Sequence, residues 1–167
     1  MPEIIDWIDE SDQKLGEVDL DKAHNEALLH RLVVIYVLNT KGEILVQVRP
    51  SGRLDHSSAG HLGLNEDYDV AASRELCEEL GICDAKLEEI GRGTYDGIEP
   101  EVEEKRIRHL YRLYQCKAKP RQLRKGEVKS AYWADPLKVW EEMKRDRENL
   151  KYCGNFKHSL ELFLHPR

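Results

Sequence analysis

Residues 32–38, Leu-Val-Val-Ile-Tyr-Val-Leu, form an apolar run that is rich in β-branched side chains. The run does not alternate with polar residues, which is typical of a central strand buried on both faces. The turn-forming residues 39–42 follow it, and residues 43–48 resume the apolar character. This pattern predicts a β-hairpin in the interior of a sheet.

Shorter apolar stretches, separated by polar turns, predict the remaining strands. Residues 3–8 and a second extended piece that ends at Val18 are expected to form an edge hairpin. Residues 19–30 predict either a short helix or an irregular cover. Further strands are predicted at residues 85–90, in a weaker stretch around Tyr95, at residues 105–116 with Ile107, His109 and Tyr111 on one side, and at residues 130–133.

Three stretches have the features of helices. Residues 67–81 show helical periodicity, with Asp67 as the expected N-cap and Gly81 as the expected left-handed stop. A second helix begins after Asp135, with Pro136 in its first turn. Its expected apolar stripe is Leu137, Trp140 and Met143, and a final helix is predicted at residues 156–164, with Leu160 and Phe163 facing inward. The alternation of strands and helices predicts an α/β fold with a mixed sheet.

The helix predicted at residues 67–81 has two different faces. Apolar residues recur every four positions on one side, and Glu75, Glu78 and Glu79 lie within about one turn on a neighbouring side. Like charges at this spacing repel one another, so a cation is expected to occupy that face. Clustered carboxylates suit a hard divalent ion such as Mg²⁺. The alternative is a solvated acidic face with no ligand.

Length, charge and the distribution of apolar residues restrict the classes of protein to which this chain can belong. A chain of 167 residues is long enough for a single domain with a proper core. Its 26 basic and 32 acidic residues give a net charge of -6, which argues against a surface that coats nucleic acid. No segment approaches the roughly 18 consecutive apolar residues of a membrane span, and the start Met1-Pro2-Glu3 lacks the layout of a signal peptide. We therefore expect a cytoplasmic protein without a membrane partner.

The four cysteines lie at positions 77, 83, 116 and 153. They form neither a CxxC pair nor a zinc-binding spacing, which predicts reduced thiols.

A longer motif surrounds the three glutamates. A glycine is followed after five residues by a glutamate, and after seven more by Arg-Glu-aliphatic-x-Glu-Glu-x-Gly-aliphatic. The pattern resembles the Nudix box at every fixed position, namely Gly60, Glu66, Arg74, Glu75, Leu76, Glu78, Glu79, Gly81 and Ile82.

This resemblance implies an α/β/α sandwich of the Nudix type that covers essentially the whole chain. The single domain 1–167 would contain an N-terminal hairpin and cover at 1–30, the Nudix box at 60–82 and C-terminal helices at 135–167. The resemblance also allows a homodimer.

The activity implied by the resemblance is Mg²⁺- or Mn²⁺-dependent hydrolysis of a small-molecule pyrophosphate, a nucleoside diphosphate linked to another moiety. The metal ligands would be Glu75, Glu78 and Glu79 together with the backbone carbonyl of Gly60. Glu75 and Glu79 also count as catalytic residues, and Arg74 would hold a box carboxylate by a bidentate contact.

Residues outside the box complete the expected site. Arg49 and Arg53, in the loop that leads to the box, are candidates for binding substrate phosphates, although either could be a solvated loop arginine. Many Nudix enzymes add an acidic residue after the box, and Glu127 is our candidate for the general base. The alternative for Glu127 is an ordinary turn glutamate, and Glu103 and Glu104 are weaker candidates for the role.

A closer branch is indicated by three short features, an Asp-Glu turn at 9–10, His-Arg at 30–31 and Gly-His at 60–61. They resemble the isopentenyl-diphosphate isomerase-like branch, which contains both isomerases and hydrolases. His24, His30 and His61 are similar in placement to the histidines that bind a metal in the isomerases. The alternative is that they are hydrogen-bonded loop or core histidines.

Two departures weigh against an isomerase. Ala59 occupies the position of the catalytic cysteine of the isomerases, and the box glutamates, from which isomerases have drifted, are all present. We therefore expect a pyrophosphohydrolase. The alternatives are a non-catalytic Nudix-fold nucleotide sensor and, less favoured, an isomerase. No feature of the sequence identifies the group attached to the diphosphate.

Overall fold

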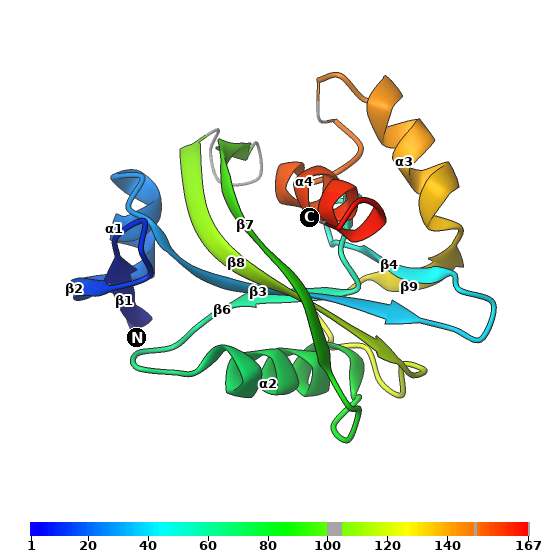
Figure 1. Ribbon diagram of the computed structural model, residues 1–167, viewed down its shortest axis with the longest axis horizontal. Coiled ribbons are helices and arrows are strands. Elements are labelled where there is room, and N and C mark those ends of the chain that lie inside the picture. Colours follow the sequence, from blue (N-terminus) through cyan, green and yellow to red (C-terminus); the bar gives the residue numbers. More distant parts are fainter. Residues whose placement is uncertain (100–104, 149, 167) are drawn as a thin grey trace.

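A mixed sheet lies between two layers of helices in the computed structural model, which describes residues 1–99, 105–148 and 150–166 (Figure 1). The nine strands of the described chain are β1 (Ile4–Ile8), β2 (Lys14–Asp19), β3 (His30–Leu38), β4 (Ile44–Val48), β5 (Leu54–Asp55), β6 (Ser58–His61), β7 (Glu88–Glu99), β8 (Lys105–Lys117) and β9 (Ser130–Ala134). The helices are α1 (Leu20–Asn25), α2 (Tyr68–Leu80), α3 (Pro136–Arg145) and α4 (Gly154–Leu164). The predicted α/β/α sandwich is confirmed. Among the described helices, none has the length and apolar character required to cross a membrane.

Strand β3 occupies the centre of the sheet, as its apolar run predicts. It pairs in parallel with β8 from His30–His109 to Leu38–Lys117, and antiparallel with β6 on its other edge. Side chains on one face of β3 pack under α2, and those on the opposite face pack under α3 and α4. The sequence therefore needed continuous apolarity here, because both faces are buried.

The predicted hairpin of 32–38 with 43–48 is only partly formed. Strand β4 pairs with β3 at a single position, Leu38–Ile44, and otherwise pairs along its length with β9. A strand has two hydrogen-bonding edges, and β6 and β8 occupy those of β3. The turn at residues 39–42 therefore connects two strands that diverge.

Two other expectations are corrected. The stretches at 85–90 and around Tyr95 belong largely to one strand, β7, which forms a long ribbon with β8, and residues 85–87 precede it. In α3, Leu137 is exposed, and Val139 and Met143 are the buried residues. Asp135 caps α3 as predicted, because its side chain accepts a hydrogen bond from the Leu137 N–H.

The N-terminal residues form a small unit at one edge of the sheet (Figure 1), consisting of β1, β2 and α1. Of the two alternatives for residues 19–30, the structure shows a short helix. The unit has its own core of Ile5, Val18 and Ala23. Asp6, which is buried, joins it to β3 through an ion pair with Arg31 at 3.0 Å. The unit is therefore held to the sheet partly by charge, and its apolar core is small.

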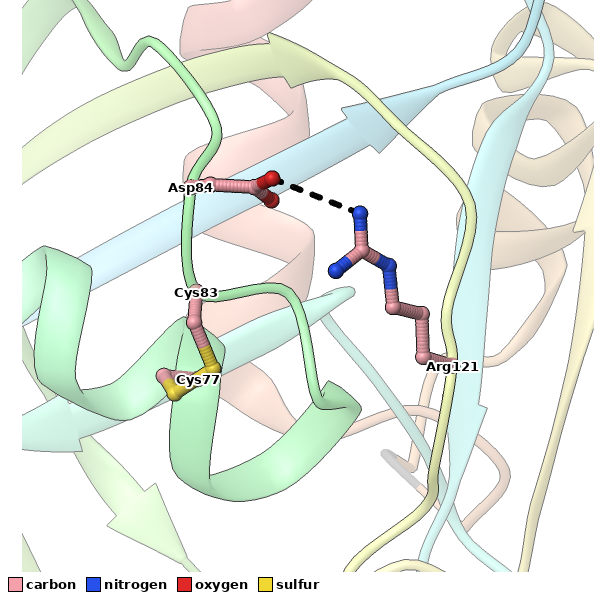
Figure 2. Close-up of a disulfide and its surroundings, with 4 residues drawn as sticks. All are labelled: Cys77, Cys83, Asp84 and Arg121. Atoms are coloured by element: carbon pink, nitrogen blue, oxygen red, sulfur yellow. Dashed lines mark hydrogen bonds and ion pairs between the residues drawn. A yellow bond between two sulfur atoms is a disulfide. The ribbon is translucent and has the colours of Figure 1, made fainter.

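The expectation of four reduced cysteines is wrong for two of them. Cys77 on α2 and Cys83 form a disulfide, with their Cα atoms 4.4 Å apart (Figure 2). The reason is local, because Gly81 ends α2 at a φ of 67° and turns the chain back along the helix. Asp84 follows the disulfide and contacts Arg121 at 3.4 Å. Cys116 is a buried free thiol, as expected, and Cys153 is buried with its Sγ 3.9 Å from Nη1 of Arg49.

The Cys77–Cys83 disulfide should stabilise the end of α2. Replacing the exposed Cys83 with Ser removes the crosslink without changing the core, and the short loop that it closes predicts a loss of roughly 2 kcal/mol in the free energy of unfolding. Chemical denaturation measures this loss. A reductant should lower the stability of the wild-type protein to the same extent and leave Cys83→Ser unchanged. A wild-type protein insensitive to reductant would contradict the prediction.

Candidate active site

Helix α2 places its glutamates in unequal environments. Glu75 and Glu79 are buried on the side that faces the sheet, whereas the side chain of Glu78 is 42% exposed. Asp67 is the N-cap by its backbone conformation, although its side chain accepts no cap hydrogen bond. Gly81 is the left-handed C-cap that the sequence predicts. The periodicity of the helix thus brings two carboxylates against strands and leaves the third at the rim.

Gly60 on β6 is in close contact with Glu75. A Cβ atom added at Gly60 would lie 2.0 Å from Cδ of Glu75, far inside van der Waals contact. Only glycine therefore allows the glutamate to approach the strand so closely. This explains physically why the Nudix motif begins with a glycine.

Arg74 organises the box through several hydrogen bonds. Its Nε and Nη2 atoms donate to the two carboxylate oxygens of Glu66 at 2.8 and 2.9 Å. Its Nη1 donates to Glu75 at 2.6 Å, and Nη2 also donates to the carbonyl oxygen of His61 at 3.0 Å. Arg74 therefore joins the loop, the helix and the end of β6 by charge-assisted bonds. Its part in catalysis stays a prediction.

Burial changes the acidity of the box carboxyls. Burial raises the pKa of Glu79 to about 8, even though Nε2 of Gln47 donates to its carboxylate at 2.7 Å. Burial also raises the pKa of Glu75, which Arg74 partly opposes. Both carboxylates thus lie where negative charge is poorly compensated by the protein alone. A cation at this position would compensate the negative charge and so lower the free-energy cost of burying it.

The acidic face opens into a cavity of about 880 Å³. Its lining includes all three glutamates of α2 and Gly60, and it extends to Arg49, Arg124 and Glu127. Its lining also includes His109 on β8 and Asn155 on α4. The cavity therefore combines anionic ligands for a cation with cationic side chains that can contact phosphate.

The two arginines predicted to bind substrate have different environments. Arg49 lines the cavity, and its Nη1 contacts Asp55 at 3.0 Å. Burial alone would raise the pKa of Asp55, but His56 and Arg49 lower it to about 2. Arg53 is buried and donates to the carbonyl oxygen of Tyr152 at 2.8 Å, and it is not among the described residues that line the cavity. Substrate binding by both arginines stays a prediction.

Glu127 lies at the rim, in a loop that docks on the end of α2. The backbone N–H groups of Arg121 and Arg124 donate to the carbonyl oxygens of Leu80 and Glu79, each at 2.9 Å. The Arg124 side chain then contacts Glu78 at 3.2 Å and Glu127 at 3.3 Å. The structure thus brings Glu127 to the cavity, and its role as general base stays a prediction. Glu103 and Glu104 lie outside the described residues.

Sequence reasoning missed several residues of the cavity. Gln47 is a polar residue within the apolar strand β4, and this break in the pattern was a usable signal. His109 was placed on the correct face of its strand but was not connected with the other histidines. For Asp55 and Arg124 the sequence offers no signal of comparable strength, because each reaches the site only through the path of its loop or short strand.

The comparisons agree with this geometry. The model of the NUDIX domain matches residues 28–153, so the chain belongs to the Nudix family. The uncharacterized Nudix hydrolase PA4841 of Pseudomonas aeruginosa is 31% identical over 97% of this chain and 94% of its own length. An isopentenyl-diphosphate Delta-isomerase of Serratia proteamaculans is 29% identical over 89% of this chain and 85% of its own. As a class of enzyme, this chain is a Nudix pyrophosphohydrolase.

Solved structures show the same fold. DR0079 from Deinococcus radiodurans superposes with a TM-score of 0.77 at 19% identity and covers 95% of this chain and 97% of that chain. The dihydroneopterin triphosphate pyrophosphohydrolase of E. coli superposes with a TM-score of 0.61 at 15% identity, over 81% of this chain and 96% of its own. At these identities the likeness concerns the fold.

The contact between Gly60 and Glu75 gives a sharp test. Gly60→Ala should displace the Glu75 carboxylate and weaken Mn²⁺ binding at the box, with a loss of activity on the order of 100-fold, because small displacements at a reacting centre are costly. Titration calorimetry with Mn²⁺ measures the first effect. Gly63→Ala is the matched control, since its Cβ would lie 3.5 Å from Glu66, an ordinary contact distance. Equal Mn²⁺ affinity in both variants would contradict this account.

Proposed function

We propose that this protein hydrolyses the phosphoanhydride bond of a nucleoside diphosphate linked to another moiety, or of a similar organic pyrophosphate, with Mg²⁺ or Mn²⁺. One observation carries the proposal. Three glutamates of α2 and Gly60 line a cavity that also contains arginines, and two of the glutamates are buried with raised pKa values. A solvated acidic face does not explain buried, mutually repelling carboxylates.

The chemistry of these ligands fits a hard divalent cation. Glu75, Glu78 and Glu79 would hold it, with the backbone carbonyl of Gly60 as a further oxygen ligand. Bound there, the ion supplies charge neutralisation for the phosphate oxygens and lowers the pKa of a water molecule. Arg74 keeps Glu75 in place, and Gln47 does the same for Glu79. These hydrogen bonds from Arg74 and Gln47 hold the carboxylate oxygens of Glu75 and Glu79 in one arrangement before the substrate binds.

Other side chains would position the substrate. Arg49 and Arg124 both line the cavity and offer charged N–H groups to phosphate oxygens. Arg53 would act indirectly, by holding the segment that contains Tyr152 through its hydrogen bond to the Tyr152 carbonyl oxygen. Glu127 would accept a proton from the attacking water, since a rim carboxylate that is half exposed can take up a proton and release it to solvent.

The proposal also covers the partners, the location and the assembly of the protein. We propose a small-molecule substrate, no nucleic-acid or membrane partner, a cytoplasmic location, and a homodimer as the assembly consistent with the family resemblance. The net charge of -6 supports the exclusion of nucleic acid as a general partner.

One observation favours the isomerase alternative, and another opposes it. A relative named as an isopentenyl-diphosphate Delta-isomerase aligns with most of the chain. Ala59, however, lies at the cavity wall next to Gly60, and its methyl group cannot donate or accept a proton. The sensor alternative has no such observation in its favour. Hydrolysis requires the complete set of box carboxylates, whereas binding alone does not require it.

Hydrolysis should depend on Glu78. With Mg²⁺, the wild-type protein should release phosphate or a nucleoside monophosphate from a substrate in a panel of nucleotide sugars, dinucleotides and nucleoside triphosphates. Glu78→Gln should lower this rate by at least about 100-fold, since losing a metal ligand costs no less than losing an outer contact. Glu141→Gln, on the exposed surface of α3, is the control that keeps the activity. Folded, Mg²⁺-loaded protein that released nothing from the whole panel would favour the sensor.

The general base can be assigned by comparing three variants. Glu127→Gln should lower kcat on the order of 100-fold, while Mn²⁺ affinity stays close to that of the wild type. Glu103→Gln and Glu104→Gln test the weaker candidates in the same assay. A larger loss in either of these than in Glu127→Gln would overturn the assignment of Glu127.

A further inference from the structure

Cys77 lies inside the Nudix box, and its disulfide with Cys83 spans the end of α2 (Figure 2). Glu78 and Glu79 follow Cys77 directly, and Glu75 lies two residues before it. Cys83 is exposed, whereas Cys77 is half-buried. A crosslink that thiols in solution can reach is thus attached to the same helical turn as two of the proposed metal ligands.

The segment that follows α2 is held by the disulfide and by weaker contacts. Gly81 reverses the chain at a φ of 67°, and its N–H donates to the carbonyl oxygen of Cys77 at 3.0 Å. Ile82 is buried in the core between α2 and the sheet. Asp84 contacts Arg121 at 3.4 Å, but these side chains are 71% and 67% exposed, and exposed ion pairs contribute little stability. The disulfide therefore carries much of the restraint, and Ile82 keeps the chain in place without it.

The end of α2 also positions the loop at the rim of the cavity. The carbonyl oxygen of Glu79 accepts the N–H of Arg124 at 2.9 Å. The carbonyl oxygen of Leu80 accepts the N–H groups of Arg121 and Gln122 at 2.9 and 3.3 Å. These acceptors are among the last carbonyl groups of a helix, which have no partner within the helix itself. They keep their geometry only while the last turn is formed.

Arg124 connects this loop with the proposed active-site acids. Its side chain contacts Glu78 at 3.2 Å and Glu127 at 3.3 Å, and all three residues line the cavity. Helix ends fray when the contacts that hold them are removed. Fraying of the last turn would therefore shift Glu78 and Glu79 together with the loop that bears Glu127.

We propose that Cys77 and Cys83 form a thiol–disulfide switch, in which the oxidised protein holds the box glutamates and the loop at residues 121–127 in the active arrangement and the reduced protein is less active. The switch rests on the proposed hydrolysis and on the proposed cytoplasmic location. A cytoplasm keeps most thiols reduced, and the disulfides that occur there are usually transient and either catalytic or redox-sensing. The exposed sulfur of Cys83 gives cellular thiols access to the bond.

The exchange needs a low-molecular-weight thiol and its disulfide, such as the two forms of glutathione. In reduction, a thiolate of the reductant attacks Sγ of Cys83, which breaks the protein S–S bond, forms a mixed disulfide and releases the Cys77 thiolate. A second thiolate attacks the reductant's own sulfur in the mixed disulfide and releases the Cys83 thiolate. The protein gains two electrons and the two protons of the reductant thiols, and the reductant leaves as its disulfide. Oxidation is the reverse of these steps.

Activity in the two redox states tests the proposal on the full-length protein. The wild-type protein is equilibrated with glutathione disulfide or with millimolar reduced glutathione, and alkylation followed by mass spectrometry measures the state of Cys77 and Cys83. With Mg²⁺, the reduced protein should hydrolyse its substrate with a kcat/KM roughly 10-fold lower, and its Mn²⁺ affinity should fall by a similar factor, because the contacts that orient metal ligands are lost. Oxidation with glutathione disulfide should restore both.

Three variants assign the effect to this pair of cysteines. Cys83→Ser should have the activity of the reduced wild-type protein in both buffers. Asp84→Ala is the matched control, because it removes the exposed ion pair beside the disulfide and leaves both cysteines in place. It should keep the activity and the redox response. Cys153→Ser should also keep the redox response, which excludes the thiol that lines the cavity as its origin.

Amide hydrogen exchange gives a measurement that does not depend on hydrolysis. Reduction should speed exchange in residues 77–82 and 121–127 by at least roughly 10-fold and leave exchange in β3 unchanged, because opening is confined to the helix end and its loop. A disulfide with only a structural role would lower the stability to denaturant without changing activity, Mn²⁺ affinity or exchange in the loop.

Two results would overturn the switch. One is a wild-type protein that stays fully oxidised in millimolar reduced glutathione. The other is a fully reduced protein whose activity, Mn²⁺ affinity and loop exchange equal those of the oxidised protein. If neither form hydrolyses any substrate but Mn²⁺ affinity and loop exchange still respond to reduction, the switch is supported and the proposed function fails, so the two failures are distinguishable.

Discussion

The close approach of α2 to β6 is the constraint on which the site depends. The carboxyl group of Glu75 occupies the space that a side chain at Gly60 would fill. Once the helix lies that near the sheet, Glu79, one turn further on, reaches the amide of Gln47 on β4. The repulsion between the carboxylates is then concentrated in a small volume, and Arg74 compensates it from one side only. The remaining negative charge favours a cation at this position.

Both helical layers contribute to the cavity, although each packs on its own core. Helix α2 rests on one face of β3, and α3 and α4 rest on the other. The beginning of α4 nevertheless brings Asn155 to the same cavity as the glutamates. The parallel pairing of β3 with β8 places His109 beside His30, at the boundary with the N-terminal unit. The substrate pocket is therefore bounded by segments from the whole length of the chain.

The end of α2 is held by contacts of three kinds. Its last carbonyl groups accept hydrogen bonds from the loop that contains Arg124 and Glu127. Gly81 reverses the chain, and the Cys77–Cys83 disulfide fastens the reversed segment to the helix. A Cβ at Gly81 would lie 2.9 Å from the backbone nitrogen of Gln122, so the loop and the helix end fit closely. The helix that bears the three glutamates is in this way tied to the loop that supplies the proposed general base.

Local signals in the sequence were reliable where the structure depends on near neighbours. The apolar run of β3, the periodicity of α2, and the caps at Gly81 and Asp135 each involve only a few adjacent residues, and the structure shows all of them. The errors concern interactions between distant segments. Strand β4 leaves its predicted partner because β6 and β8 already occupy the edges of β3, and Leu137 is exposed because the sheet lies under Val139 instead.

By itself, the sequence determined that one helix would present three glutamates at the spacing of the Nudix box, because helical geometry converts spacing directly into a shared face. Only the tertiary structure decided which carboxylates are buried, that Gln47, Asp55 and Arg124 adjoin them, and that His109 completes a cluster with His24, His30 and His61. Strand pairing brings these residues together across long separations in the chain, and burial, which depends on packing, sets their charge.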